Sequence, residues 1–210
     1  MSTTATHLAS AAFHAGEAHF QLSRYKSAAQ HLQRVVDHYQ DHAVYAPSLL
    51  RLGECQAALQ RWSVSERTFA KYLERFADGE QGYQAQFGVG WACEHQKRYA
   101  EAISAYGKVV SRHQGPTAAR AQFQIGQCLY AQKQYNEAVR ARLKVDILYA
   151  YPEWSAAALF EAGRCFEELN KTAQAREHFQ QVTQKYEDTR WAQMATRRLS
   201  TLSSASLPGR

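Results

Sequence analysis

The stretch FGVGWACEHQKRYAEAISAYGKVVSRH, residues Phe87 to His113, contains a pattern that recurs along nearly the whole chain. Counted from Gly90 as position zero, it has an aromatic residue at −3, small residues at +2 and +12, another aromatic residue at +9 and a large apolar residue at +16. The same frame recurs at intervals of 37, 37, 36 and 37 residues, at Gly16, Gly53, Gly90, Gly126 and Gly163. A period of this length indicates stacked helical hairpins.

The small residues predict how the two helices of each hairpin pack. Positions −4, −1, 0 and +3 fall on one stripe of a helix with 3.6 residues per turn, so their side chains face inward together. Glycine inside a helix costs about 1 kcal/mol relative to alanine, which indicates a packing reason for its recurrence at position zero. We expect the glycine and the alanine or serine at +12 to allow close approach of the two helices. The residues at +16 and +19 should extend the buried stripe along the second helix.

The uninterrupted phasing predicts one elongated solenoid of five hairpins with a closing helix. We expect a polar N-terminal segment at 1–6, the solenoid at 7–202 and a flexible tail at 203–210. The expected hairpins span about 7–40, 43–77, 80–113, 117–150 and 153–187, and a cap follows at 189–202. A cap is needed because the last hairpin of a solenoid would otherwise expose its core.

The residues around Leu49, Leu52 and Gly53, with alanine at +12 and an aromatic residue at +16 in other copies, resemble the tetratricopeptide repeat. The period exceeds the usual length of about 34 residues, and the proline that usually closes the second helix is absent. Two segments, YAYPEWSAAALFEAGRCF (149–166) and KYEDTRWAQMATRRL (185–199), resemble a longer-helix branch of this family. That branch includes bacterial outer-membrane assembly lipoproteins and periplasmic coordinator proteins of the Tol–Pal type. The resemblance covers roughly residues 8 to 203.

Composition and charge place limits on location and on the class of partner. Hydrophobic residues make up 45% of the chain, and no run approaches the roughly 18 apolar residues that a membrane span needs. The first eight residues lack the pattern of a secretory signal. The location is therefore expected to be the periplasm or cell envelope if the chain is part of a longer protein with an upstream signal, and the cytoplasm otherwise. Lysine and arginine exceed aspartate and glutamate by six, but their spread over most helices does not favour a nucleic-acid interface.

The residue types that carry catalysis or metal binding do not form a recognisable site. Cys55, Cys128 and Cys165 share position +2 with alanines of other repeats, which predicts small buried side chains. His38 and His42 have the i, i+4 spacing of two zinc ligands, but no third ligand is implied nearby. They are also suitably placed to interact with a helix C-terminus. We find no phosphate-binding loop, paired carboxylates or nucleophile elbow, and we expect no enzyme activity, cofactor or metal.

Arg142 is the exception in the +16 column, where the other repeats have Leu, Phe, Tyr and Phe. One interpretation is an aliphatic stem packed along the groove with its guanidinium reaching water. The other is a local binding site for a carboxylate. The sequence favours the first interpretation.

The family resemblance also implies a set of contact residues. In tetratricopeptide proteins the first helices of the hairpins line a concave groove, and position-by-position transfer gives ten candidates. These are Phe20, Glu54, Phe87, Trp91, Glu94, Phe123, Gln127, Tyr130, Arg164 and Glu167. The alternative is that the aromatic residues at −3 simply complete the core. Trp91 and Tyr130 break the regularity of their columns, which favours a contact role because such residues are enriched at binding hot spots.

Together these features predict a right-handed all-α solenoid that acts as a non-catalytic protein–protein interaction scaffold. The expected partners are protein or peptide segments within a bacterial cell-envelope assembly, with no small-molecule substrate. The alternative is a cytoplasmic helical-repeat regulator that binds an acidic partner or nucleic acid. A salt titration of a complex distinguishes the two, because phosphate binding weakens steeply with salt.

Overall fold

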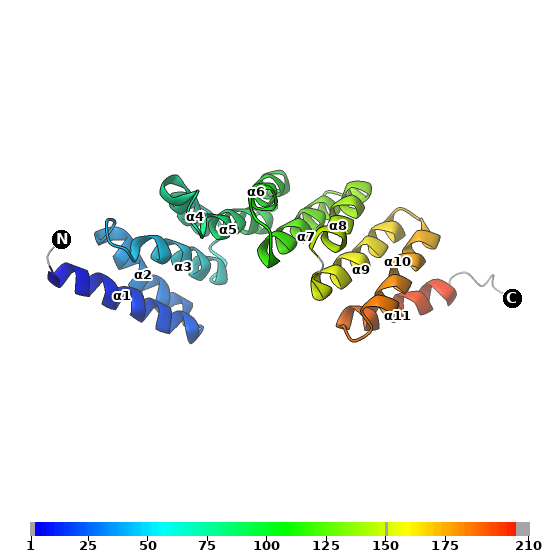
Figure 1. Ribbon diagram of the computed structural model, residues 1–210, viewed down its shortest axis with the longest axis horizontal. Helices are drawn as coiled ribbons and strands as arrows, with labels where there is room; N and C mark the ends of the chain where they lie inside the picture. The colour runs from blue at the N-terminus through cyan, green and yellow to red at the C-terminus, as the bar shows by residue number, and fades with distance from the viewer. Residues whose placement is uncertain (1–2, 150, 205–210) are drawn as a thin grey trace. The chain divides into compact units, whose positions relative to one another are not determined.

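The structure of the protein, a computed structural model, describes residues 3–149 and 151–204, and all regular secondary structure within these ranges is helical. The chain divides into two compact units, Met1–Lys108 (unit 1) and Val109–Arg210 (unit 2), with the division inside α6. Figure 1 labels the helices. Their bounds are α1 (Thr3–Gln21), α2 (Tyr25–His38), α3 (Tyr45–Ala58), α4 (Trp62–Phe76), α5 (Gly82–His95), α6 (Tyr99–Arg112), α7 (Pro116–Ala131), α8 (Tyr135–Tyr149), α9 (Pro152–Glu168), α10 (Thr172–Lys185) and α11 (Arg190–Ser204).

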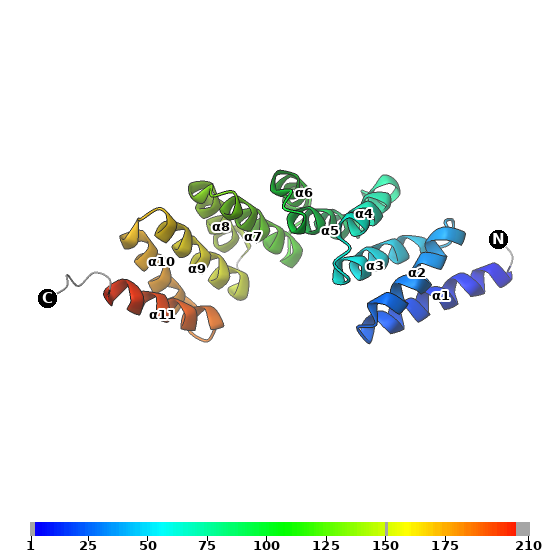
Figure 2. The same ribbon diagram turned by 180° about the vertical axis from the view of Figure 1, so that it is seen from behind.

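Helices that follow each other in the chain pack together as hairpins. In unit 1, α1 packs on α2, α2 on α3, α3 on α4 and α4 on α5, and in unit 2 the same holds from α7 to α11. The paired helices lie side by side in Figure 1 and also from behind in Figure 2. The first helices of neighbouring hairpins touch as well: α1 with α3, α3 with α5, and α7 with α9. This packing confirms the predicted all-α fold class of stacked hairpins.

The recurring glycines make room for one large side chain of the second helix. A Cβ atom built on Gly53 would lie 2.7 Å from the Phe69 ring, and one on Gly90 would lie 2.7 Å from the Tyr106 ring. Each of these side chains stands sixteen residues after its glycine, and the other three glycines have the same relation to their +16 residues. The +12 residues are fully buried in all five repeats. The predicted close approach at position zero and at +12 is confirmed, and the +16 side chain is what occupies the space.

The turn inside each hairpin is made by a residue at +7 that has a positive φ and is not glycine. These residues are Ser23, Gln60, Lys97, Lys133 and Asn170, with φ between 55° and 60°. At the third turn, the Lys97 N–H donates to Glu94 O at 2.8 Å and the Arg98 N–H donates to Cys93 O at 3.0 Å. These two bonds form a Schellman motif, which satisfies the last carbonyls of the helix and reverses the chain. The sequence pattern did not reveal this column because its residue types differ.

The helix ends differ from the expected ones mainly at the N-terminus. Residues 1–6 were predicted to lie outside the first helix, but α1 begins at Thr3. The segment TTAT contains neither Pro nor Gly, so nothing in it stops a helix from extending upstream. The expected tail at 203–210 begins inside α11, and residues 205–210 lie outside the described part of the chain. The prediction of a single continuous domain stays a prediction.

Each unit has its own apolar interior. In unit 1, Leu32, Leu49 and Phe69 belong to one cluster of buried residues, and in unit 2, Phe160, Phe179 and Val182 belong to another. No described helix has the length and apolar character required to cross a membrane. These cluster residues come from positions −4, +16 and +19, which were predicted to face inward, and from position −3, which was predicted to line a groove with the core as the alternative.

The last helix covers the end of the final hairpin in unit 2. Ala195 of α11 is fully buried, and Trp191 and Leu199 pack against the cluster that contains Phe160 and Phe179. We expect removal of residues 189–210 to lower the melting temperature and to cause concentration-dependent association, because the apolar side of α9 and α10 becomes exposed. Thermal denaturation and light scattering measure these effects. Met194→Gln, which changes an exposed α11 side chain, is the control. A truncated chain that stays monomeric and equally stable would show that α11 is not a cap.

Candidate binding surface

The first helix of each hairpin carries the ten residues predicted to line a groove. We call the surface formed by α1, α3 and α5 in unit 1, and by α7 and α9 in unit 2, the A-helix surface of that unit. Because these helices touch their neighbours within a unit, residues on them can interact across hairpins. Unit 1 contains Phe20, Glu54, Phe87, Trp91 and Glu94, and unit 2 contains Phe123, Gln127, Tyr130, Arg164 and Glu167.

In unit 1 an arginine brings two of the predicted residues together. Arg51 Nε donates to Glu17 Oε1 at 2.6 Å, and Arg51 Nη1 donates to Glu54 Oε2 at 2.6 Å. The guanidinium lies over the Phe20 ring, with Cζ 4.2 Å from the ring centroid. Burial raises the pKa of Glu54, and the charge of Arg51 opposes this effect. Arg51 on α3 therefore contacts α1 in two ways: it forms a bidentate ion pair with Glu17 and a cation–π contact with Phe20.

Phe87 is a core residue, so its prediction as a groove contact is wrong. Only 9% of its surface is exposed, and its ring packs against Tyr106 with 5.2 Å between centroids. The Tyr106 hydroxyl donates to Glu94 Oε2 at 2.7 Å. The physical reason is that position −3 lies beside the +16 side chain, so its aromatic ring fills the space between the two helices. The alternative interpretation, that the −3 aromatic residues complete the core, holds at this position.

Trp91 belongs to a row of aromatic rings that ends at the surface. It stacks on Phe87 with 6.3 Å between centroids and meets His95 edge-on at 4.6 Å. His95 in turn stacks on Trp62, the first residue of α4, at 4.0 Å. Burial lowers the pKa of His95. Trp91 is half-buried, so it supports the local packing and still leaves part of its indole exposed.

In unit 2 the most unusual residue is Arg142, whose side chain is completely buried. Its Cζ lies 4.6 Å from the centroid of the Phe123 ring, and its Nη2 donates to Gln127 Oε1 at 2.8 Å. The nearest carboxylate is that of Glu161, 3.8 Å from Nη2. The Nε and Nη1 atoms have no hydrogen-bond partner among the described residues. The Arg142 stem takes the place that an apolar +16 residue fills in the other hairpins.

The burial of Arg142 overturns the expectation that its guanidinium reaches water. Arg142 stands on α8 and faces α7 and α9, which leave no opening for the head group to extend into solvent. Burial lowers the pKa of Arg142, whereas the charge of Glu161 works to raise it. Phe123 and Gln127 are thereby fixed by a charge beneath them, so these two predicted contact residues serve the interior as well as the surface.

Glu161, the carboxylate near Arg142, also belongs to a cluster of polar residues on the surface of α7 and α9. Arg164 Nη1 donates to Glu161 Oε2 at 3.1 Å, and its guanidinium lies over the Tyr130 ring at 5.4 Å. The Tyr130 hydroxyl donates to Glu168 Oε1 at 3.0 Å. Burial, together with the bond to Glu168, raises the pKa of Tyr130 to about 12. Tyr130 and Arg164 are both half-buried, so the structure places these two predicted residues in direct contact on the A-helix surface.

Glu167 extends the same surface towards the final helix. Its Oε2 accepts a hydrogen bond of 2.7 Å from Nη2 of Arg198 on α11. The A-helix surface of unit 2 thus carries alternating charges, with the aromatic ring of Tyr130 among them.

Sequence reasoning missed the residues that organise both surfaces. Arg51, Glu161 and Arg198 were not among the candidates, although each forms an ion pair with a neighbour on the A-helix surface. The i, i+3 spacing of Arg51 with Glu54 and of Glu161 with Arg164 is a signal that could have found two of them. No local pattern predicts the Glu167–Arg198 pair, because its members lie on different helices.

Among the described residues, the cysteines and histidines form no disulfide and no cluster of three metal-binding side chains. All four cysteines are free and buried, and burial raises the pKa of Cys55 to about 12 and that of Cys165 to about 11. Cys55 and Cys165 are therefore thiols at neutral pH, and thiols are weak nucleophiles. No group of three metal-binding side chains occurs among the described residues. His42 Nδ1 instead accepts a hydrogen bond of 3.2 Å from the Val44 N–H.

Comparison with protein families connects this architecture to a known repeat. One profile, described as a tetratricopeptide repeat, matches residues 46–110 and 98–153, and a second with the same description matches 10–42 and 157–189. The chain belongs to the tetratricopeptide repeat family. The predicted resemblance to this family is confirmed, whereas neither profile distinguishes the envelope branch. No curated protein sequence matches the chain significantly.

Solved structures of tetratricopeptide repeat proteins share the fold. A crystal structure of MamA has a TM-score of 0.73 and 16% identity, with 86% of this chain and 92% of that chain covered. MamA 41-end from Desulfovibrio magneticus RS-1 gives 0.71 and 20%, with 87% and 98% covered. A putative kinesin light chain from Podosopora anserina, with nearly identical TPR-like repeats, gives 0.68 and 16%, with 87% and 99% covered. At these identities the likeness establishes the fold alone.

Proposed function

We propose that this tetratricopeptide repeat chain is a non-catalytic scaffold that binds protein segments on its A-helix surfaces. The observation that carries the proposal is the composition of these surfaces. The half-buried aromatic residues Trp91 and Tyr130 share these surfaces with ion pairs that include Glu54, Arg164 and Glu167. Rings supply apolar contact area, and charged pairs can exchange partners with a polypeptide at modest cost because surface ion pairs contribute little to stability.

The bacterial cell envelope is the proposed setting of this scaffold. The support is the resemblance of the segments at 149–166 and 185–199 to the longer-helix branch of the family, described above. Immunodetection in fractionated cells of the native host tests this setting. The proposal requires the protein to co-fractionate with the periplasm or with an envelope complex, and recovery in the cytoplasm alone would contradict it.

We expect Trp91→Gln and Tyr130→Ala each to weaken the binding of peptide segments selected against the immobilised protein. Glutamine occurs at the Trp91 position in another repeat (Gln127), and alanine at the Tyr130 position (Ala57), so both replacements suit their columns. Loss of a hot-spot aromatic side chain typically costs about 2 kcal/mol, near thirtyfold in Kd. Fluorescence anisotropy with the selected peptides measures this change. Trp91→Gln is tested with peptides that bind unit 1, and Tyr130→Ala with peptides that bind unit 2.

Exposed apolar residues on second helices provide matched controls in each unit. Val64 on α4 is 37% exposed and Ile147 on α8 is 75% exposed, and Val64→Ser and Ile147→Ser should leave Kd unchanged. Thermal denaturation verifies that each variant is folded. Unchanged binding in Trp91→Gln and Tyr130→Ala, combined with loss in either control, would place the binding surface on the second helices.

A further inference from the structure

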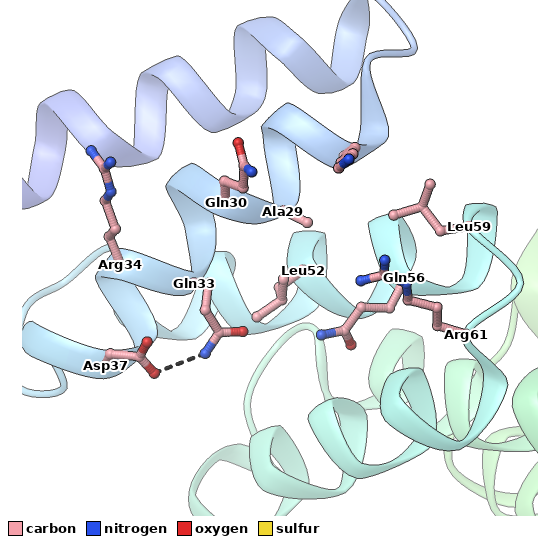
Figure 3. Close-up of a pocket in the computed structure, with 10 residues that line it drawn as sticks. Ala29, Gln30, Gln33, Arg34, Asp37, Leu52, Gln56, Leu59 and Arg61 are labelled. Atoms are coloured by element: carbon pink, nitrogen blue, oxygen red, sulfur yellow. Dashed lines mark hydrogen bonds between the residues drawn. The ribbon is translucent and has the colours of Figure 1, made fainter.

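A hollow with a volume of about 510 Å³ opens in unit 1 between α2 and the C-terminal half of α3. None of the ten predicted groove residues lines it. Figure 3 shows Leu52 between two polar ends, with Gln33 and Asp37 at one end and Gln56 and Arg61 at the other. A volume of this size is within the usual range for sites that hold a small ligand or a few side chains.

Gln56 presents a hydrogen-bond donor to this hollow. The residue is only 6% exposed, and its Oε1 accepts a hydrogen bond of 2.6 Å from the Thr68 hydroxyl. This bond fixes the orientation of the amide. The oxygen is bound to Thr68, and the NH₂ group is the part of the amide that faces the hollow. The structure gives Nε2 no partner among the described residues. The anchored amide can therefore donate hydrogen bonds from Nε2 to a ligand that accepts them.

Three cations line the same hollow, and none of them forms an ion pair with a described carboxylate. Lys26, Arg34 and Arg61 take part in no ion pair or side-chain hydrogen bond among the described residues. The one lining carboxylate, that of Asp37, accepts a hydrogen bond of 2.8 Å from Gln33 Nε2 at the opposite end from Arg61. By contrast, Arg51 and Arg98 in the same unit are each bound by two carboxylates. The hollow therefore combines positive charge with a donor and has no internal anion at the Arg61 end.

We propose that this hollow binds an acidic peptide segment, which makes it a second binding site beyond the A-helix surfaces. A carboxylate of the segment accepts hydrogen bonds from Gln56 and Arg61, with Lys26 adding charge. An adjacent apolar side chain packs on Ala29, Leu52 and Leu59, which supply the apolar part of the lining. Charge-assisted hydrogen bonds of this kind are about twice as strong as neutral ones.

The lining fits a peptide better than a nucleic acid. Proteins that follow a phosphate backbone use a continuous positive groove, whereas this hollow has a carboxylate, Asp37, at one end. The end with Gln56 and Arg61 can bind one or two carboxylates, and the apolar lining residues can pack against a neighbouring aliphatic side chain. A nucleic acid is therefore an alternative that the experiment must distinguish.

The test uses the full chain and a fluorescein-labelled Gly-Glu-Leu-Glu-Glu peptide amide, with the same peptide carrying glutamine in place of glutamate as its neutral counterpart. Fluorescence anisotropy should show binding of the acidic peptide at least tenfold tighter than binding of the neutral one. Arg61→Gln and Gln56→Leu should each weaken binding of the acidic peptide about tenfold or more. If Gln56→Leu disturbs folding through the lost Thr68 bond, Arg61→Gln alone decides, because Arg61 is exposed.

A matched control separates this site from the overall positive charge. Arg67→Gln combined with Lys97→Gln removes two exposed cations of the same unit that do not line the hollow. Glutamine already stands at the position of Lys97 in the preceding repeat, as Gln60 with φ 57°. This control should change Kd less than twofold.

Equal losses in the control and in Arg61→Gln overturn the proposal, as does failure to prefer the acidic peptide. Tighter binding of a single-stranded oligonucleotide, lost in Arg61→Gln, overturns it in favour of nucleic acid. Trp91→Gln should leave binding of this peptide unchanged, so failure at the A-helix surface is distinguishable from failure here.

Discussion

Glu161→Gln is expected to lower the free energy of unfolding by about 3–5 kcal/mol, the usual cost of leaving one member of a buried ion pair without its partner. The guanidinium of Arg142 is completely buried, and Glu161 is the carboxylate near it, with 3.8 Å between Nη2 and Oε2. Loss of the Glu161–Arg164 pair adds little, because Arg164 is 38% exposed at its side chain.

Arg142→Leu is the matched variant, and it should cost far less than Glu161→Gln. Position +16 is Leu32 in the first hairpin, where the side chain fills the space in front of Gly16. Replacing a buried charge with a well-packed apolar residue is often neutral or stabilising. Glu161 retains Arg164 as a partner at 3.1 Å. The double variant Arg142→Leu, Glu161→Gln should therefore recover most of the stability that Glu161→Gln alone loses.

Urea denaturation of the four proteins in this cycle measures the coupling between the two residues. The expected result is a coupling energy of about 2 kcal/mol or more, with the m-value unchanged. If Glu161→Gln is as stable as the parent and the two effects simply add, then Glu161 is not the counter-charge of Arg142.

Gly90→Leu should lower the free energy of unfolding by about 3 kcal/mol or more, at the upper end of the usual cost of overpacking. Even a Cβ atom at this position would stand 2.7 Å from Cδ1 and Cε1 of Tyr106. The Tyr106 ring is fully buried, packs on Phe87 and is fixed by its bond to Glu94. It cannot rotate away without losing these contacts, so α5 and α6 must separate.

Gly107→Ala is the control, because a Cβ atom at Gly107 meets no other atom within 4 Å. Gly107 lies inside α6, where alanine should stabilise the helix by about 0.5–1 kcal/mol. Thermal and urea denaturation should thus shift in opposite directions for Gly90→Leu and Gly107→Ala. A Gly90→Leu protein with an unchanged melting temperature would contradict the role of this glycine as the space for Tyr106.

The sequence predicted the hairpins well because the buried face of a helix is determined by residues close together in the sequence. The glycine frame, the small +12 residues and the apolar +16 and +19 columns each follow from the 3.6-residue period, and the structure buries Ala102, Tyr106 and Val109 accordingly. The candidate surface follows less directly from the sequence. Transfer of groove positions chose Trp91, Tyr130 and Arg164, which are half-buried, and also Phe87, which is in the core.

What the sequence alone determined is the number, order and inward faces of the helices, because periodic burial within one helix needs no knowledge of its neighbours. Only the tertiary structure decided which polar side chains meet. Arg51 and Glu17 are 34 residues apart, and Arg142 and Gln127 are 15 apart, on different helices. Their pairing depends on the rotation and offset of two packed helices, which a periodic pattern does not specify. Arg142 is a further example. The other repeats have apolar residues at position +16, so the sequence did not indicate which charged group would lie near Arg142. The packing of α8 against α7 and α9 places its buried guanidinium near Glu161.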